Sequence, residues 1–290
     1  LSWLVGLGML PVQQWMWPAA TADNPAIFRS HITQSNMMAL AVFFALLNSR
    51  DAETVRARLA WGLFSLLGAT NVLFMVQGRT GYMIMLVLLA RFAWSTMMRY
   101  MQKRGRQWGW CQGAAVALVL AGLIVTTYHA SSRLHERVEL AVSEYQAWMP
   151  NQGKDTSTGQ RLDFYYNALQ IVRQHPVFGV GTGGFAAAFA QQTAGTSVLQ
   201  AGNPHNEYLL IAVQTGVLGL ALLLYLFIAL WRNAPLLKTP SEQDAARGLV
   251  LAYLANSMFN SALHDHSDGL LFAFMTAVLF AGFKQEKHRG

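Results

Sequence analysis

The sequence contains a single cysteine and few charged residues. Cys111 is the only cysteine among 290 residues, so the chain can form neither an intrachain disulfide nor a cysteine metal cluster. Charged residues make up 12% of the chain, whereas soluble domains contain roughly 25%. Because 53% of the residues are hydrophobic, the composition excludes disorder, a disulfide-based secreted scaffold and most soluble enzymes. It indicates a membrane protein.

The hydrophobic residues are gathered in blocks that match membrane-spanning helices. A helix needs about 20 mostly apolar residues to cross a bilayer, because lipid offers its backbone no hydrogen-bond partner. The sequence therefore predicts an all-α polytopic membrane protein. The predicted spans are 33–48, 59–77, 82–98, 111–128, 207–231, 248–263 and 270–283, with residues 1–10 as the end of an eighth. Because the chain begins with Leu1 and lacks a basic n-region, we interpret its start as a truncation or the edge of an ordered core, not as a signal peptide.

Lys and Arg are concentrated in alternate connections between these spans. The connections after residues 48, 98 and 231, together with the C-terminal tail, hold more than half of the 21 basic residues. The short connections on the other side hold only Arg29 and Arg79. Since cytoplasmic loops carry an excess of Lys and Arg, the basic segments are predicted to face the cytoplasm. The charge excess then needs no nucleic acid to explain it.

The chain is predicted to fall into three parts, namely transmembrane helices in 1–128, a large external loop in 129–206 and three C-terminal transmembrane helices in 207–290. The spacing of apolar residues predicts two amphipathic helices in the external loop. The first covers 131–148 and is expected to lie on the membrane as a wall beside a substrate. The second starts near Thr158 and ends before Pro176. Its apolar side is predicted to consist of Leu162, Tyr166, Leu169 and Val172.

The external loop contains a long stretch without acidic residues. No Asp or Glu lies between Asp163 and Glu207. The cationic or titratable residues in this stretch or beside it are Arg161, Arg173, His175 and His205. Such a positive surface suits an anionic substrate, and a chance pattern in a polar loop is the alternative interpretation.

Arg79 lies in the string QGRTG, a tight external turn between two spans. Its neighbouring glycines let the backbone approach a ligand closely. Two N–H groups of a guanidinium can donate hydrogen bonds to two oxygens of one phosphate, so Arg79 is a candidate phosphate-binding residue. The alternative is an arginine that snorkels to the membrane interface. Arg161 is either solvated or turned inward over the membrane.

His205 lies in the string PHNEY, at the outer end of the span 207–231. Imidazole is the side chain best suited to accept a proton near neutral pH. His205 is therefore a candidate general base, with a structural histidine as the alternative. Glu207 is too close in sequence to face His205 across a helix.

Two further motifs are not interpreted as cofactor sites. The run Gly179–Gly184 matches G-x-G-x-x-G, but a dinucleotide site also needs a preceding strand and an acidic residue about 20 positions further on. These glycines are predicted to turn the loop back towards the membrane, or to present backbone N–H groups to an anion. The residues of the last external turn resemble metal ligands but occupy one short segment, so no metal site is predicted; they are His264, Asp265, His266 and Asp268.

Four strings in the chain together resemble the O-antigen ligase and polymerase superfamily. They are FRSHITQSNMMALAVFFALL, GRTGYM, RLDFYYNALQIVRQHPVFGVGTGGF and PHNEYLLIAVQTGVLGL. The resemblance extends from about Phe28 to Phe283, and it rests on the order of the motifs more than on any one of them. Members of that superfamily usually have more spans than this chain shows, and the additional ones would precede Leu1.

The resemblance implies a GT-C-type glycosyltransferase of the bacterial inner membrane with a large periplasmic loop. Such a ligase moves a glycan from undecaprenyl diphosphate to a sugar hydroxyl of lipid A–core, without a metal, nucleotide or other cofactor. Carried over to this sequence, Arg79 and Arg161 would bind the diphosphate and His205 would be the base on the acceptor hydroxyl. Arg173, His175 and Glu207 are secondary candidates, the first two for lipid or core phosphates. We expect direct displacement with inversion at the sugar carbon.

Three alternatives to the ligase remain open. An O-antigen polymerase or a protein O-oligosaccharyltransferase would use the same donor and differ in the acceptor. A transporter of lipid-linked glycans would be expected to show inverted repeats and broken helices at mid-membrane, and the sequence indicates neither. A structural membrane scaffold is the third, and the grouping of Arg79, Arg161 and His205 in family-like motifs argues against it.

Overall fold

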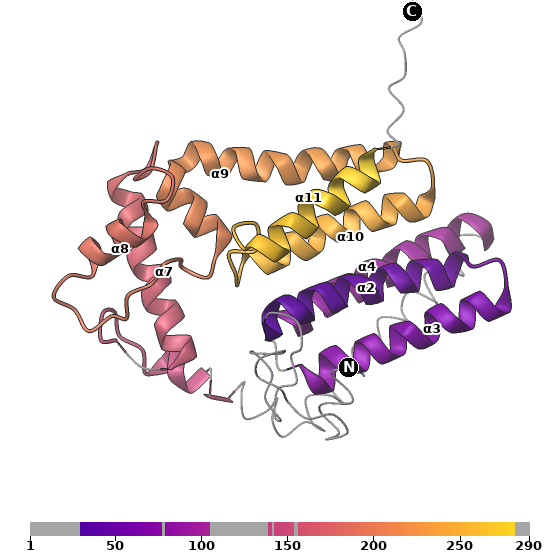
Figure 1. The fold of residues 1–290 in the computed structure, drawn as a ribbon, viewed down its shortest axis with the longest axis horizontal. Helices are drawn as coiled ribbons and strands as arrows, with labels where there is room; N and C mark the ends of the chain where they lie inside the picture. Colours follow the sequence, from indigo (N-terminus) through magenta and orange to yellow (C-terminus); the bar gives the residue numbers. More distant parts are fainter. Residues whose placement is uncertain (1–29, 77–78, 105–138, 141, 154–155, 282–290) are drawn as a thin grey trace, which may run out of the picture. The chain divides into compact units, whose positions relative to one another are not determined.

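The computed structural model describes residues 30–76, 79–104, 139–140, 142–153 and 156–281. Every regular element in them is a helix, as expected for an all-α membrane protein (Figure 1). The predicted spans 1–10 and 111–128 lie outside these residues, and so does half of the predicted helix 131–148. In its other half, residues 139–140 and 142–146 are helical.

The chain divides into two compact units, each described here by itself. Among the described residues, unit 1 takes in those between 30 and 99, 227–256 and 263–281. Unit 2 takes in those between 100 and 226, and 257–262. The helix α9 (Glu207–Asn233) runs from unit 2 into unit 1. The division of the chain into 1–128, 129–206 and 207–290 stays a prediction.

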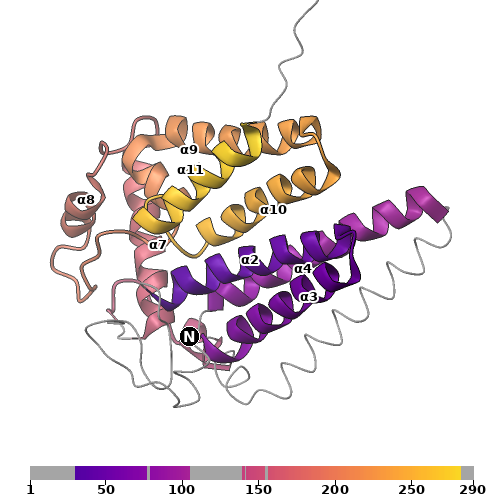
Figure 2. The same cartoon turned by 45° about the vertical axis from the view of Figure 1, so that its right-hand side comes forward.

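Unit 1 is a set of long apolar helices. Its elements besides α9 are α2 (His31–Asp51), α3 (Val55–Thr70), the π-helical turn η1 (Asn71–Met75), α4 (Arg79–Arg104), the 3-10 turn η2 (Ala234–Leu236), α10 (Pro240–Ser257) and α11 (His266–Phe280). In Figures 1 and 2, α2, α3 and α4 lie side by side. Ser30 and Thr54 cap α2 and α3 by accepting hydrogen bonds from backbone N–H groups in the first turn.

Four of the described helical segments are long and apolar enough to cross a membrane. They are His31–Asp51, Val55–Met75, Thr80–Gln102 and Glu207–Leu236. They agree with four of the predicted spans, so the prediction of a multi-pass membrane protein is confirmed.

The structure differs from the prediction at the two C-terminal spans. The predicted span 248–263 is wrong at both ends, because α10 starts at Pro240 and ends at Ser257. Its first half carries charged residues, and the polar run that follows Ala255 favours turns over helix. The last helix, α11, has 15 residues and rises about 22 Å. A hydrocarbon core of about 30 Å is thicker than that.

Helix α9 is interrupted at Gly216, which has φ 66° and ψ −161°. The carbonyl groups of Val213 and Gln214, freed by the interruption, accept hydrogen bonds of 2.9 Å from the N–H groups of Val180 and Gly181. On the other side of the interruption, the N–H of Val217 donates to the carbonyl of Pro176 at 2.8 Å. The segment 176–184, which connects α7 to α8 and is rich in glycine, thus supplies hydrogen bonds in place of the missing helical ones. The expectation of unbroken helices is wrong for α9.

Glycine is required on both sides of this contact. A Cβ atom on Gly216 would lie 2.1 Å from the carbonyl oxygen of Val177, and one on Gly179 would lie 2.4 Å from the carbonyl carbon of Gln214. Both residues also have a positive φ, a region that L-residues with a side chain adopt only at a cost. The two backbones therefore approach more closely than any other residue type allows.

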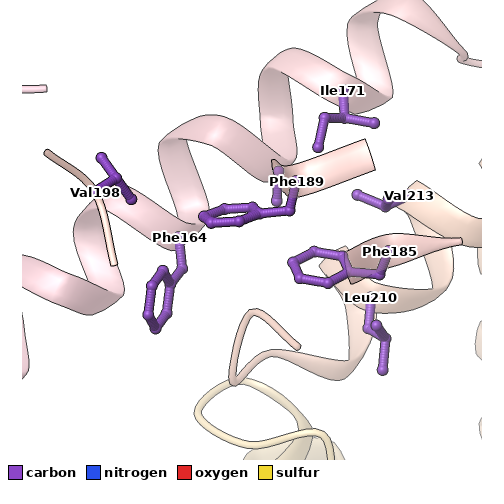
Figure 3. Close-up of a cluster of buried hydrophobic side chains, with 8 residues drawn as sticks. Phe164, Ile171, Phe185, Phe189, Val198, Leu210 and Val213 are labelled. Atoms are coloured by element: carbon purple, nitrogen blue, oxygen red, sulfur yellow. The ribbon is translucent and has the colours of Figure 1, made fainter. Parts of the chain in front are cut away.

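Unit 2 is organised around α7 (Ser157–Gln174), α8 (Phe185–Gln192) and the first part of α9. Thr156 caps α7 through its side chain, and the predicted extent of this helix is confirmed. Figure 3 shows the hydrophobic core that joins the three helices. The buried residues of this core are Phe164, Ala168, Ile171, Phe185, Phe189, Val198, Leu210 and Val213.

The apolar face of α7 differs from the predicted one. Phe164, Ala168 and Ile171 are buried at helical spacing, whereas Leu169 is 46% exposed. The predicted face failed because α7 also buries Asp163 and Asn167, so hydrophobicity alone does not mark the side that packs. The Asp163 carboxylate accepts hydrogen bonds from the indole N–H of Trp148 at 3.1 Å and the backbone N–H of Asn151 at 3.0 Å.

We predict that Gly216→Ala lowers the thermal unfolding temperature of the purified protein in detergent far more than Gly183→Ala. Both glycines have a positive φ, so both variants carry a backbone penalty of about 1 kcal/mol. Only the Gly216 variant also places a methyl group against backbone, because no atom lies within 4 Å of a Cβ on Gly183. Equal losses for the two variants would contradict the proposed docking of the loop into α9.

Candidate functional site

His205 stands in a strained backbone conformation immediately before α9. Its φ is 52°, in the left-handed region that a residue with a side chain seldom adopts. Hydrogen bonds hold both the N–H and the carbonyl group of His205. The N–H of His205 donates to Oδ1 of Asn203 at 2.9 Å, and its carbonyl accepts from the Tyr165 hydroxyl at 3.2 Å. These two bonds fix the point from which the imidazole extends.

The connection between α10 and α11 also contributes to the hydrogen bonds around His205. The carbonyl of Met258 accepts hydrogen bonds from the Tyr165 hydroxyl at 3.3 Å and from Nδ2 of Asn206 at 3.0 Å. Oδ1 of Asn206 in turn accepts from the N–H of Leu209, which caps the first turn of α9. Three separate segments of unit 2 therefore meet around the backbone of His205.

The environment of the His205 imidazole favours its neutral form. The ring stacks against Phe164, with a centroid separation of 6.2 Å and an interplanar angle of 26°. Burial lowers the pKa of His205, and the positive charge of Arg161 lowers it further. At neutral pH the imidazole is therefore unprotonated and able to accept a proton.

Arg161 lies close enough to His205 for its charge to act on the imidazole. It lies one helical turn before Tyr165 on α7, so the two side chains are on one face. The charge of Arg161 acts on both His205 and Tyr165. Burial raises the pKa of Tyr165, and Arg161 opposes that rise. The Tyr165 hydroxyl thus keeps its proton at neutral pH and remains a donor to the His205 carbonyl.

The acidic residues that border the acid-free stretch are both withdrawn from the surface. Asp163 is 1% exposed and Glu207 is 2% exposed. Glu207 lies in the first turn of α9, where a carboxylate is stabilised by the helix dipole. The surface between these two residues consequently presents basic side chains without exposed carboxylates from this stretch.

Arg173 and His175 lie at the opposite end of α7 from Arg161. Arg173 lies twelve positions after Arg161 on the helix, which is about 18 Å along the helix axis. Both side chains are exposed. His175 ends α7 and helps to line a hollow of about 730 Å³ between α7, α8 and the glycine-rich segment. These two residues do not join the group around His205.

Arg79 is the first residue of α4, in unit 1. Its side chain is not among those that the structure describes. The meeting of Arg79 with Arg161 and His205 stays a prediction.

The glycine-rich segment 179–184 is not an anion-binding nest at the five N–H groups whose partners are known. That of Gly179 donates to the carbonyl of His175, those of Val180 and Gly181 donate to α9, that of Gly183 donates to Oε1 of Gln214, and that of Gly184 donates to the carbonyl of Gly181. Because protein atoms occupy these donors, the anion-binding interpretation of these groups is wrong. The segment instead forms a turn that packs against α9.

Two acidic residues of the 264–268 turn accept hydrogen bonds from groups within the protein. Asp265 caps α11 by accepting from the N–H groups of Ser267 and Asp268. The buried Asp268 accepts from Nδ2 of Asn36 at 2.5 Å.

Sequence reasoning missed the residues that hold His205. Tyr165 could have been found from its place one turn after Arg161. Asn203 could have been found from its spacing, because an Asn two residues before another often accepts that residue's backbone N–H. No signal in the sequence marked the carbonyl of Met258, since it comes from a distant connection.

The comparison with known proteins matches residues 63–224, more than half of the chain, to the family described as O-antigen ligase. The chain belongs to the O-antigen ligase family. The superfamily resemblance of its sequence motifs is thereby confirmed, and the matched range includes Arg79, Arg161 and His205.

A second comparison finds a relative in Haemophilus influenzae (strain ATCC 51907 / DSM 11121 / KW20 / Rd), described as an uncharacterized protein. It is 25% identical over 175 residues, which are 57% of this chain and 44% of the relative. The match therefore covers less than half of the length of this relative.

We predict that Arg161→Gln raises the pKa of His205 towards the ordinary histidine value near 6.5. Arg161 lowers the His205 pKa by disfavouring the imidazolium, so removing that charge makes protonation easier and moves the midpoint to higher pH. The midpoint can be measured from the pH dependence of His205 modification by diethylpyrocarbonate, quantified by peptide mass spectrometry. The matched control is Arg173→Gln on the same helix, which should leave the midpoint unchanged. An unchanged midpoint in Arg161→Gln would contradict the electrostatic link.

Proposed function

We propose that this member of the O-antigen ligase family is a membrane glycosyltransferase. It transfers a glycan from undecaprenyl diphosphate to a sugar hydroxyl of lipid A–core. The family supports an activity of the ligase or polymerase type; the donor, the acceptor and the GT-C class are part of the proposal. The proposal includes a location in the bacterial inner membrane with the site facing the periplasm; the distribution of Lys and Arg supports this orientation.

The observation that carries the proposal is the setting of His205, whose partly buried ring stacks on Phe164 and whose pKa is lowered by burial and by the charge of Arg161. Glycosyl transfer to a hydroxyl needs a base that takes the hydroxyl proton and a cation that neutralises the departing diphosphate. His205 and Arg161 have the chemistry for these two roles, and both lie in the family-matched range. Arg79, as a second cation on the diphosphate, completes the proposed set.

In the proposed reaction, His205 accepts the proton of the acceptor hydroxyl as the hydroxyl oxygen attacks the anomeric carbon of the donor sugar. The bond between that carbon and the diphosphate oxygen breaks, and undecaprenyl diphosphate leaves with the bonding electrons. Arg161 and Arg79 stabilise its negative charge. A single displacement inverts the configuration at the sugar carbon. The arginines supply the positive charge, so the proposal includes no cofactor.

Donor binding is expected to strengthen the base. In the structure, which holds no donor, the charge of Arg161 lowers the pKa of His205. A bound diphosphate brings negative charge to Arg161 and offsets that effect, so the His205 pKa rises. The imidazole then attracts the hydroxyl proton more strongly when the donor is in place.

Two other activities share part of this chemistry. A polymerase or a protein O-oligosaccharyltransferase would use the same base and arginines with a different acceptor. The interruption of α9 is a feature found in transporters. Here, however, the backbone of the 176–181 segment occupies the freed carbonyl and N–H groups of Val213, Gln214 and Val217. That arrangement favours a fixed support for the site over a substrate path.

We expect the full-length protein to restore the O-antigen ladder on lipid A–core in a Gram-negative host that lacks its own O-antigen ligase. His205→Ala should abolish the ladder, because no other group is proposed to take the hydroxyl proton. His175→Ala is the matched control, since this exposed histidine lies at the far end of α7, and it should leave the ladder intact. Gel analysis of lipopolysaccharide is the measurement, with membrane levels of each variant checked by immunoblot.

The same experiment separates the alternatives when the host supplies a matched glycan. If the wild type is present in the membrane but restores no ladder, the ligase proposal fails. Restoration of chain length in a host that lacks only its polymerase would then identify the polymerase. A ladder that survives in His205→Ala would overturn the role of the histidine.

A further inference from the structure

Unit 1 contains a cluster of arginines around one buried carboxylate, separate from the elements that hold His205. Asp244 of α10 accepts from Nη2 of Arg50 at 2.9 Å, from Nη2 of Arg91 at 2.5 Å and from Nη2 of Arg99 at 2.9 Å. Arg50 belongs to α2, and Arg91 and Arg99 belong to α4. One carboxylate thus joins three helices of this unit.

A second carboxylate lies at the rim of the cluster. Asp51 accepts from Nε of Arg50 and from Nη1 of Arg99, each at 3.1 Å. The Asp51 carboxylate also accepts from the hydroxyl of Ser241. The side chains of Arg91 and Asp244 are each 8% exposed, whereas that of Asp51 is 36% exposed. The cluster is therefore buried at Asp244 and open to the surroundings at Asp51.

A fourth arginine adds to the positive excess of the cluster. Arg247 lies one turn after Asp244 on α10, and its charge acts on Arg91. Its guanidinium carbon lies 5.4 Å from the centroid of the Trp231 ring. The four positive charges of Arg50, Arg91, Arg99 and Arg247 thus exceed the two negative charges of Asp51 and Asp244. The carboxylate of Glu242, in the first turn of α10, accepts a hydrogen bond from the N–H of Thr239.

Two donors in the cluster have no acceptor among the residues that the structure describes. They are the buried Nε atoms of Arg91 and Arg247. A buried N–H without a partner is costly. Of the four arginines only Arg91 is buried, and its charge is paired with that of Asp244, so the cost lies in the two unpartnered N–H groups. An anion with several oxygens that joins the cluster would remove this cost. Guanidinium groups bind phosphate particularly well, because their N–H groups match pairs of phosphate oxygens.

We propose that this cluster binds a phosphate group, with Arg91 and Arg247 as the donors that complete its coordination. The position along the chain favours a lipid headgroup as the source. Arg50 lies at the end of the candidate span His31–Asp51, and Arg99 lies near the end of the candidate span Thr80–Gln102. The ends of spanning helices are where lipid phosphates lie. A soluble phosphate is the other source of the same chemistry.

The test uses the full-length protein purified in detergent and three probes. They are phosphatidylglycerol, diacylglycerol with the same acyl chains, and inorganic phosphate. We expect phosphatidylglycerol to raise the thermal unfolding temperature and diacylglycerol, which has no phosphate, to leave it unchanged. Stabilisation by inorganic phosphate that also displaces the lipid would assign the site to soluble phosphate. The absence of any effect of phosphatidylglycerol and of inorganic phosphate would overturn the proposal.

Arg247→Gln is the decisive variant, because Arg247 takes no part in the ion pairs to Asp244 described above. It should weaken phosphatidylglycerol binding about tenfold, as expected for the loss of a charged hydrogen bond. The matched control is Arg56→Gln, which removes an exposed arginine from the first turn of α3 and should bind the lipid like the wild type. An equal loss in both variants would show non-specific attraction and overturn the proposal.

If Arg247→Gln does not fold, Arg247→Lys replaces it, with Arg56→Lys as its control. Lysine keeps the positive charge but loses the planar arrangement of donors that pairs with phosphate. We expect Arg247→Lys to bind phosphatidylglycerol more weakly than Arg56→Lys. Equal binding by these two variants would contradict a phosphate held by the Arg247 guanidinium.

Discussion

The docking of the glycine-rich segment into the interruption of α9 is the interaction on which the structure of unit 2 depends. An apolar helix that breaks must find new partners for its freed N–H and C=O groups, because lipid provides none. Here the partners are backbone groups of Pro176, Val180 and Gly181. These residues connect α7 to α8, so the same hydrogen bonds hold the end of one helix and the approach to the next. The connection between α7 and α8 is thereby tied to a candidate membrane-spanning helix through backbone atoms.

This tie has a consequence for the group around His205. Helix α7 is held at its C-terminal end by the interrupted α9 and along its length by the core around Phe164 and Phe189. Arg161 and Tyr165, in its first half, are therefore carried by a helix with few ways to move. Tyr165 then fixes the carbonyl of His205. The unusual φ of His205 persists because hydrogen bonds from its surroundings hold both of its backbone groups.

The parts of the fold that follow from periodicity could be predicted from the sequence, and the parts that follow from tertiary contact could not. Four of the spans predicted from the apolar blocks agree with helices in the structure, and the spacing of residues predicted α7. The interruption at Gly216 could not be predicted, because its cause is a loop distant in sequence that supplies the missing hydrogen bonds. For the same reason the packed face of α7 was wrong, since Asp163 and Asn167 are buried through partners in the 148–151 segment. Residue chemistry identified Arg161 and His205 as candidates, but only tertiary structure revealed how their charges interact.

Arginine has two different electrostatic settings in this chain, and the difference follows from where the carboxylates lie. In unit 1, Asp51 and Asp244 form ion pairs with Arg50, Arg91 and Arg99, so two carboxylates offset part of the positive charge within the protein. In unit 2, the carboxylate of Asp163 is directed to Trp148 and Asn151, and the charge of Arg161 reaches His205. A cation neutralised by carboxylates stabilises helix packing, whereas a cation that acts on an imidazole sets its protonation. The absence of acidic residues between Asp163 and Glu207 therefore has a physical effect on the candidate base, beyond any attraction of an anionic substrate.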